Sequence, residues 1–132
     1  MQVSKKSQYG LRAMTYLAKV FQEKEKKVYP LKEISKAEGI PFDFLEKIIS
    51  ELEKADLVKA KRGSQGGYFL NKKPKEITVG KIVRVLEKTT EPVKCFGCAR
   101  ARGCMAKNAW QEVGQSLDST LDSITLADLI KK

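Results

Sequence analysis

Histidine is absent from the 132 residues of this chain. Its absence excludes Ser-His-Asp triads, Cys-His pairs, HExxH zinc sites and any imidazole general base. Long hydrophobic runs are also missing, since none approaches the roughly 18 apolar residues of a membrane-spanning helix. The N-terminal segment MQVSKKSQYG has no apolar core of the kind a signal peptide carries. We therefore expect a soluble, cytoplasmic protein, and an enzyme with this sequence would have to rely on carboxylates, lysine or cysteine.

Acidic residues are scarce relative to basic ones. Lys and Arg number 26 against 16 Asp and Glu, which gives a formal net charge of +10 and a pI near 9.6. Residues 93–132 hold 6 basic and 4 acidic side chains, so most of the excess lies in residues 1–92. Such an excess favours a polyanionic partner, most often nucleic acid and less often a membrane surface. The length suits one small domain plus an assembly element.

The cysteines are few and clustered. All three, Cys95, Cys98 and Cys104, fall within ten residues. An odd, clustered set in a reducing compartment argues for metal binding or redox chemistry over structural disulfides. The nearby Arg100 and Arg102 would favour thiolates and hence a thiol switch, whereas a zinc site would need a fourth ligand. A redox enzyme using Cys95 and Cys98 is disfavoured, because that motif does not open a helix in a βαβ unit.

The N-terminal half predicts a helix-turn-helix. Apolar residues recur at helical spacing over residues 8–21 and again over residues 31–37. Gly39 and Pro41 then end one helix and begin the next, which runs from about Pro41 to Ala55. Two helices joined by a short Gly-containing turn form the helix-turn-helix pattern. The stripe of the last helix that we expect to be buried is Leu45, Ile48, Ile49 and Leu52.

A basic, glycine-rich hairpin is predicted directly after this helix. Residues 57–61 and 67–70 suit short strands, and residues 62–66 suit the loop between them. Glycines in that loop allow a positive φ and a close approach to a phosphate. Arg62 at its edge could enter a minor groove, where the potential is most negative. The pattern is typical of the wing of a winged helix, and the alternative is a solvent-exposed hairpin with a chance arginine.

The C-terminal part predicts a helix from about Thr78 to Lys88, an irregular segment, and a long helix from Cys104 to Ser123. The long helix carries apolar or small residues at coiled-coil spacing, which predicts a seam. So small a protomer cannot bury this seam by itself, and we therefore expect a dimer interface. Thr125 and Asp128 predict a capping box that begins a final short helix. The seam residues are Ala106, Trp110, Val113, Leu117, Thr120 and Ile124.

These segments together resemble the IscR/NsrR/CymR-type bacterial winged-helix regulators of the Rrf2 superfamily over nearly the whole chain. The motifs that carry the resemblance are the recognition helix at residues 39–46, the wing at residues 62–68, the cysteines and the segment ITLADL at residues 124–129. The resemblance implies a mainly α fold with a small β-hairpin. It implies a homodimeric transcription factor, often a repressor, that binds a pseudo-palindromic double-stranded DNA operator.

Three regions with separate roles follow from the resemblance. Residues 1–90 would form the winged helix-turn-helix DNA-binding domain. Residues 91–104 would form a cysteine-bearing sensor loop. Residues 105–132 would form the dimerisation helix and a short C-terminal helix.

The resemblance also implies which residues contact DNA. A carboxylate at Glu46 can accept from cytosine N4 and repels phosphate, so it would select sequence by exclusion. Asp43 has a second interpretation, as a helix-start residue favoured by the helix dipole alone. The residues implied are Pro41, Phe42, Asp43, Phe44, Glu46 and Lys47 of the recognition helix; Arg62, Gly63, Ser64, Gln65 and Tyr68 of the wing; and Lys5 and Lys6 on phosphates.

In many members of this family, three loop cysteines hold an iron–sulfur cluster whose state sets DNA affinity. The resemblance therefore implies that Cys95, Cys98 and Cys104 bind a cluster, of 2Fe–2S or 4Fe–4S type. The spacing departs from the family pattern, because only two residues separate the first two cysteines where five are common, and Lys107 stands where a histidine ligand often does. The candidates for a fourth ligand are Gln8, Glu91 and Asn108. The alternative is the same DNA-binding dimer controlled by thiol oxidation, zinc or a regulatory protein partner.

Overall fold

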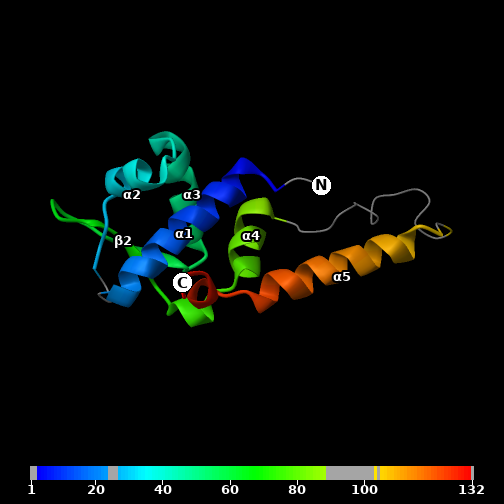
Figure 1. The fold of residues 1–132 in the computed structure, drawn as a ribbon. Helices are drawn as coiled ribbons and strands as arrows, with labels where there is room; N and C mark the ends of the chain where they lie inside the picture. Colours follow the sequence, from blue (N-terminus) through cyan, green and yellow to red (C-terminus); the bar gives the residue numbers. More distant parts are fainter. Residues whose placement is uncertain (1–2, 24–26, 89–102, 104, 132) are drawn as a thin grey trace.

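The computed structural model describes residues 3–23, 27–88, 103 and 105–131. The described elements are α1 (Lys5–Glu23), α2 (Leu31–Glu38), α3 (Phe42–Lys54), β1 (Val58–Lys61), β2 (Gly67–Leu70), the 3-10 helix η1 (Pro74–Glu76), α4 (Val79–Glu87), α5 (Lys107–Ser123) and α6 (Leu126–Leu129). Helices α1 to α4 and the hairpin form one body, from which α5 extends (Figure 1). The mainly α fold with a small β-hairpin is confirmed. No helix in these ranges is both long enough and apolar enough to cross a membrane.

The predicted helix-turn-helix is present as α2 and α3. The four residues of the predicted α3 stripe are fully buried against α1 and α4. Gly39 ends α2 with φ +64°, a conformation that glycine adopts without penalty, and its N–H donates to the Ser35 carbonyl. Of the apolar residues of α2, Ile34 is fully buried, Leu31 is half-buried and Ala37 is exposed.

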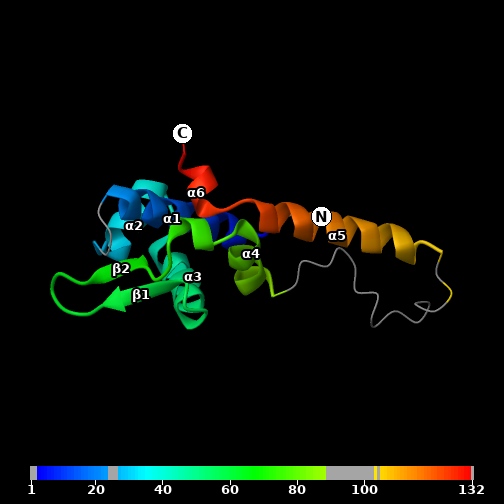
Figure 2. The same ribbon diagram turned by 90° about the horizontal axis from the view of Figure 1, so that it is seen from below.

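A short extended segment around Tyr29, which the sequence did not predict, pairs with the hairpin. β1 and β2 pair antiparallel, with Val58 opposite Leu70. Tyr29 exchanges two backbone hydrogen bonds with Tyr68, at 3.0 and 2.9 Å. Gly67 permits this approach, since a Cβ there would lie 2.4 Å from the Tyr29 carbonyl carbon. The hairpin is thus anchored to the segment before α2 and points away from α5 (Figure 2).

The long helix begins later than predicted and ends at its predicted last residue, Ser123. It starts at Lys107 rather than Cys104, so Ala106 precedes it as the N-cap. Ile124 follows it in an extended conformation, because the Thr125 hydroxyl accepts from the Asp128 N–H in the predicted capping box and begins α6. The two ends of the predicted seam therefore lie outside the helix. Every residue of α5 is described, and none is buried within the protomer.

A carboxylate fastens α4 to the start of α1. Glu87 Oε1 accepts from Ser7 Oγ at 2.6 Å, from the Ser4 backbone N–H at 3.1 Å and from the Ser4 hydroxyl. Ser7 is only 1% exposed. The hydrogen bonds from Ser4 and Ser7 hold the pKa of Glu87 below its ordinary value of 4.5. Glu87 thus stabilises the fold as the carboxylate.

Glu87→Gln is expected to lower the free energy of unfolding by about 1–2 kcal/mol at pH 7, because charge-assisted hydrogen bonds become neutral ones. The pKa of Glu87 is lower in the folded state, so its contribution is complete above the unfolded-state pKa near 4.5 and is lost as the pH falls through the folded-state pKa. Denaturation from pH 7 to pH 3 should therefore show the two proteins converging only in acid. Glu112→Gln, on the exposed surface of α5, is the control. A stability difference that stays constant with pH would contradict this role.

Candidate nucleic-acid interface

The outer face of α3 lines a groove beside the start of α1. The buried stripe of α3 turns its opposite side outward, so Asp43, Glu46 and Lys47 are exposed. The groove has a volume of about 900 Å³ and combines most of the predicted recognition residues with one predicted phosphate contact. Its lining residues are Lys6, Pro41, Asp43, Phe44, Glu46, Lys47, Ser50 and Glu51.

Two of the predicted contact residues have structural partners. Lys6 Nζ lies 2.5 Å from Glu51 Oε2 and so meets a carboxylate oxygen that has no other partner among the described residues. The ring of Phe44 packs edge-on against Tyr9, with centroids 5.5 Å apart, and is half-buried. Phe42, by contrast, is 37% exposed at the start of the helix. Phe44 therefore joins α3 to α1, whereas Phe42 faces outward.

The exposed face of α3 carries two carboxylates, although the protein as a whole is strongly basic. Asp43 lies in the first turn of α3, where the helix dipole favours a carboxylate, and it is exposed. Glu46 is exposed one turn later on the same face, with the exposed Lys47 next to it. Carboxylates so placed can accept from base donors but repel phosphates. The arrangement suits selection among sequences more than nonspecific attraction.

The tip of the hairpin is fully exposed. Arg62, Gly63, Ser64 and Gln65 all lie on the surface there. Gly63 has φ +117°, a conformation that other residues rarely adopt. Tyr68 lies instead in β2, half-buried, where its backbone pairs with Tyr29; burial first, and then the negative charge of Glu53, raises the pKa of its phenol. The structure thus separates a free tip from an anchoring tyrosine.

Arg12 ties α1 to the turn of the helix-turn-helix, a contact that the sequence analysis missed. Its guanidinium donates to the Glu38 carbonyl at the end of α2, and Arg12 Nε lies 3.6 Å from Glu38 Oε1. A cation at a helix C-terminus is favoured by the helix dipole. Arg12 and Lys5 also lie over the ring of Tyr9, each 5.8 Å from its centroid. These contacts help fix the orientation of α3.

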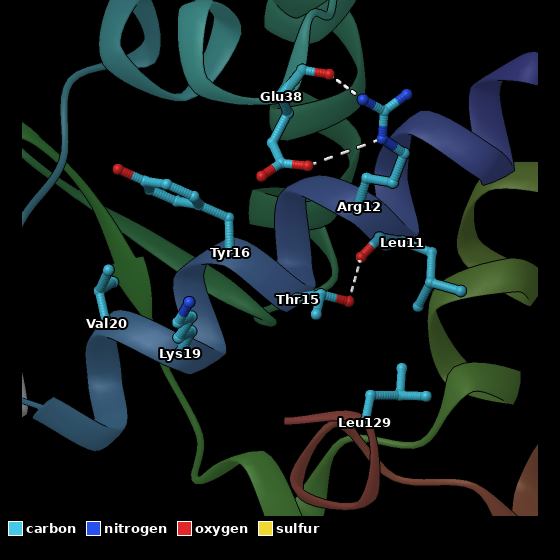
Figure 3. Close-up of a pocket in the computed structure, with 8 residues that line it drawn as sticks. All are labelled: Leu11, Arg12, Thr15, Tyr16, Lys19, Val20, Glu38 and Leu129. Atoms are coloured by element: carbon cyan, nitrogen blue, oxygen red, sulfur yellow. Dashed lines mark hydrogen bonds and ion pairs between the residues drawn. The ribbon is translucent and has the colours of Figure 1, made fainter. Parts of the chain in front are cut away.

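A second groove, of about 640 Å³, lies between α1, the end of α2 and α6 (Figure 3). Leu11 of α1 and Leu129 of α6 line its apolar end. Several of its polar groups are engaged within the protein, since Arg12 pairs with Glu38 and Thr15 Oγ1 donates to the Leu11 carbonyl at 2.7 Å.

The predicted cluster ligands Cys95, Cys98 and Cys104, and the candidate Glu91, lie outside the described residues. Gln8 is exposed on α1, where its Nε2 donates to the Val3 carbonyl at 2.8 Å, and Asn108 is exposed in the first turn of α5. Within the described ranges, no three His, Cys, Asp or Glu side chains are grouped to hold a metal ion. Three thiols are the donor type that iron–sulfur clusters take, so the donor set fits such a group with one position left for another donor.

Comparison with known proteins connects these features. The family model described as "Rrf2: Iron-dependent Transcriptional regulator" matches residues 3–132. The chain belongs to the Rrf2 family. Among its curated relatives is the HTH-type transcriptional regulator IscR of Aliivibrio salmonicida, which is 35% identical over 133 residues that cover 98% of this chain and 77% of the relative. The predicted family is therefore confirmed.

Solved structures agree with this Rrf2 assignment. T. potens IscR has a TM-score of 0.82 and 40% identity, covering 99% of this chain and 87% of that one. CymR, the global cysteine regulator of B. subtilis, has a TM-score of 0.81 and 36% identity, covering 98% and 96%. These likenesses confirm the winged-helix regulator fold. This Rrf2 protein is a transcriptional regulator and not an enzyme, which excludes the redox-enzyme alternative.

Proposed function

We propose that this Rrf2 regulator binds a pseudo-palindromic double-stranded DNA operator as a homodimer. One α3 per protomer lies in the major groove of each half-site, and each wing lies over a flanking minor groove. The observation that carries the proposal is the exposed face of α3, on which Asp43, Glu46 and Lys47 line one groove with Lys6. The exposed Arg62 tip and the net charge of +10 support it.

The homodimer is supported by α5. No residue of this helix is fully buried in its own protomer, while Trp110 and Leu117 are 40% and 37% exposed on it. An apolar seam left in water favours association with a second copy. In this proposal residues 1–90 read DNA, residues 91–104 sense the signal, and residues 105–132 form the dimer.

Operator affinity is set by an iron–sulfur cluster held by Cys95, Cys98 and Cys104. The family's description as iron-dependent supports this step, as does the set of three thiols. The cluster supplies a centre sensitive to redox state. The chain supplies the thiolates, and the cysteine segment joins α4 to α5 along the sequence, so a change there bears on both the DNA-binding body and the dimer helix.

The first test is the content of iron and acid-labile sulfide per protomer, on protein purified without oxygen, together with operator selection from a randomised DNA library. Near-stoichiometric iron and sulfide and an enriched pseudo-palindrome would support both halves of the proposal. A colourless protein that also fails anaerobic reconstitution would overturn the cluster. Failure to enrich any sequence would overturn the operator.

A second mode of control is thiol oxidation, zinc or a protein partner acting on the same dimer without a cluster. The likeness to CymR favours it, because that regulator matches this chain almost end to end, and an oxidized form of Staphylococcus aureus CymR is 29% identical with a TM-score of 0.81. Basic residues beside the cysteines would favour thiolates. An iron-free protein whose operator affinity changes on mild oxidation, on zinc addition or with a co-purified partner would identify which mode applies.

Arg62→Ala is expected to weaken operator binding about tenfold and to reduce the preference for A·T flanks. The reason is that the narrow minor groove of A·T-rich DNA has a strongly negative potential, which attracts an arginine. Lys75→Ala, at an exposed position of η1 away from the hairpin tip, is the control. Fluorescence anisotropy on operators with A·T or G·C flanks measures both effects. Unchanged affinity and unchanged flank preference would contradict the role of the wing.

A further inference from the structure

We propose that Arg84 is a positioning residue that sets the angle between α5 and the DNA-binding body, and through it the separation of the two α3 helices. It acts by holding Asp118 and Asp122 of α5. This inference rests on the proposed dimeric, DNA-binding function and names the contact that gives the dimer its spacing.

The contact itself is a two-pronged ion pair between α4 and α5. Arg84 Nη1 donates to Asp122 Oδ1 at 2.7 Å, and Nη2 donates to Asp122 Oδ2 at 2.9 Å. Nη2 also donates to Asp118 Oδ1, one turn along α5, at 3.3 Å. The planar guanidinium presents its donors in a fixed fork, so pairing with two carboxylates constrains direction as well as distance. We call these three residues the Arg84 clamp.

A glycine makes room for the clamp. Gly80, in the first turn of α4, is buried. A Cβ at this position would lie 2.2 Å from Asp122 Oδ1 and 2.9 Å from Arg84 Nη1. The close approach of α5 to α4 therefore depends on the missing side chain, and the Asp122 carboxylate occupies the space that it leaves.

A second attachment of α5 lies at its C-terminal end. There Val79 N–H donates to the Ile124 carbonyl at 2.8 Å, and Leu126 N–H donates to the Ile77 carbonyl at 2.9 Å. This pair of hydrogen bonds fixes a point but leaves the tilt of the helix about that point to other contacts. No residue of α5 is fully buried, and among the described residues the Arg84 clamp is the polar side-chain contact between α4 and α5 that can restrain this tilt.

The helix converts a small tilt into a large displacement. Its 17 residues span about 25 Å at 1.5 Å per residue. A tilt of about 10° would move the far end by about 4 Å, close to the roughly 3.4 Å that separates successive base pairs along one strand. Figures 1 and 2 both show α5 reaching away from the body that carries α3. A tilt of about 10° would therefore shift the two half-sites relative to each other by about one base pair.

The clamp contributes more to geometry than to folding. The Arg84 side chain is 38% exposed, and those of Asp118 and Asp122 are 50% exposed. Exposed ion pairs add little to stability. Removing the clamp should thus leave the protein folded, so that the effect of the clamp on the angle of α5 can be measured apart from any effect on stability.

The first arm of the test is a distance within one protomer. Spin labels are attached to noncanonical amino acids that replace Ser50 of α3 and Glu112 of α5, and labelled chains are diluted in unlabelled ones. Pulsed electron paramagnetic resonance then measures the distance between the two labels, which depends on the angle of α5. We expect one narrow distance in the otherwise unaltered protein, a distribution at least twofold broader in Arg84→Gln, and recovery of a narrow one when Arg84→Asp is combined with Asp122→Arg. Lys81→Gln, exposed on the same helix, is the control. An equally narrow distance in Arg84→Gln would overturn the proposal.

The second arm uses operators whose half-sites are moved apart in single base-pair steps. The unaltered protein should bind the operator with one spacing at least about tenfold more tightly than the others. For Arg84→Gln this difference in affinity should be less than threefold, while its affinity for a single half-site should be unchanged. If the unaltered protein is monomeric or shows no spacing preference, the proposed function fails. If it shows both properties but Arg84→Gln keeps the same preference, or loses the dimer itself, the role assigned to Arg84 fails.

Discussion

Leu117→Glu is expected to convert the proposed dimer into a monomer and to lower operator affinity by at least about 100-fold. Leu117 lies at the centre of the helical part of the seam and is 37% exposed in the protomer. A second copy would enclose it, and enclosing a carboxylate without a partner costs several kcal/mol. A monomer also loses the gain from binding two linked half-sites at once. Sedimentation velocity and fluorescence anisotropy on the selected operator measure the two effects.

The control for this variant is Ser119→Glu, which places the same carboxylate on an exposed position of the same helix, away from the seam. Because α5 buries no residue in the protomer, both variants should keep the thermal unfolding of the winged-helix body within a few degrees of the original. A dimeric Leu117→Glu protein would contradict the seam. Loss of the folded body would show that α5 stabilises the protomer itself.

Local patterns explain how much of this fold could be predicted. The buried stripe of α3 follows from helical periodicity, and the turn before it follows from Gly39 and Pro41. The cap at Thr78 is also local, since its hydroxyl accepts from the Lys81 N–H three residues later. Each of these features depends on residues within one or two helical turns, where chemical type determines the backbone directly.

The features that the sequence did not reveal join distant residues. Glu87 reaches Ser4 and Ser7, which are 83 and 80 positions away, and Arg84 reaches Asp122 across 38. Each is an ordinary polar side chain until the fold brings its partner to it. The seam was extended to Ile124 for a related reason, because apolar spacing continues there although the backbone leaves the helix.

In the proposed complex, affinity and specificity would come from different residues. The net charge of +10 would supply attraction to phosphate that is independent of sequence. Asp43 and Glu46 would oppose that attraction on α3 itself, so close docking would be favourable only where bases offer donors to the carboxylates. The sequence could place these residues on one helix. Only the structure shows that Lys6 is paired with Glu51 and that Phe44 packs against Tyr9, which leaves the two carboxylates as the outward acidic groups of the groove.

Cys98→Ala and Cys104→Ala are each expected to lower bound iron and sulfide to less than about a tenth of the original content and to remove the visible charge-transfer bands. The reason is that thiolates are the usual protein ligands of such clusters, and this chain has three cysteines and no histidine to replace one. Iron and sulfide assays with absorption spectra on anaerobically prepared protein make the measurement. Met105→Ala is the control, because it alters the exposed neighbour of Cys104 without removing a thiol.

Cys95→Ala decides how the departure from the family spacing is accommodated. If Cys95 is a ligand, Cys95→Ala should lower bound iron and sulfide as much as Cys98→Ala and Cys104→Ala do. Gln8→Ala on α1 or Asn108→Ala on α5 would then test which residue supplies the fourth ligand. Iron retained in Cys98→Ala or Cys104→Ala would contradict the ligand set. Nonspecific DNA binding should be unchanged in all of these variants, because it depends on the basic surface. A cysteine variant that loses iron and keeps its operator affinity would separate cluster binding from control of DNA binding.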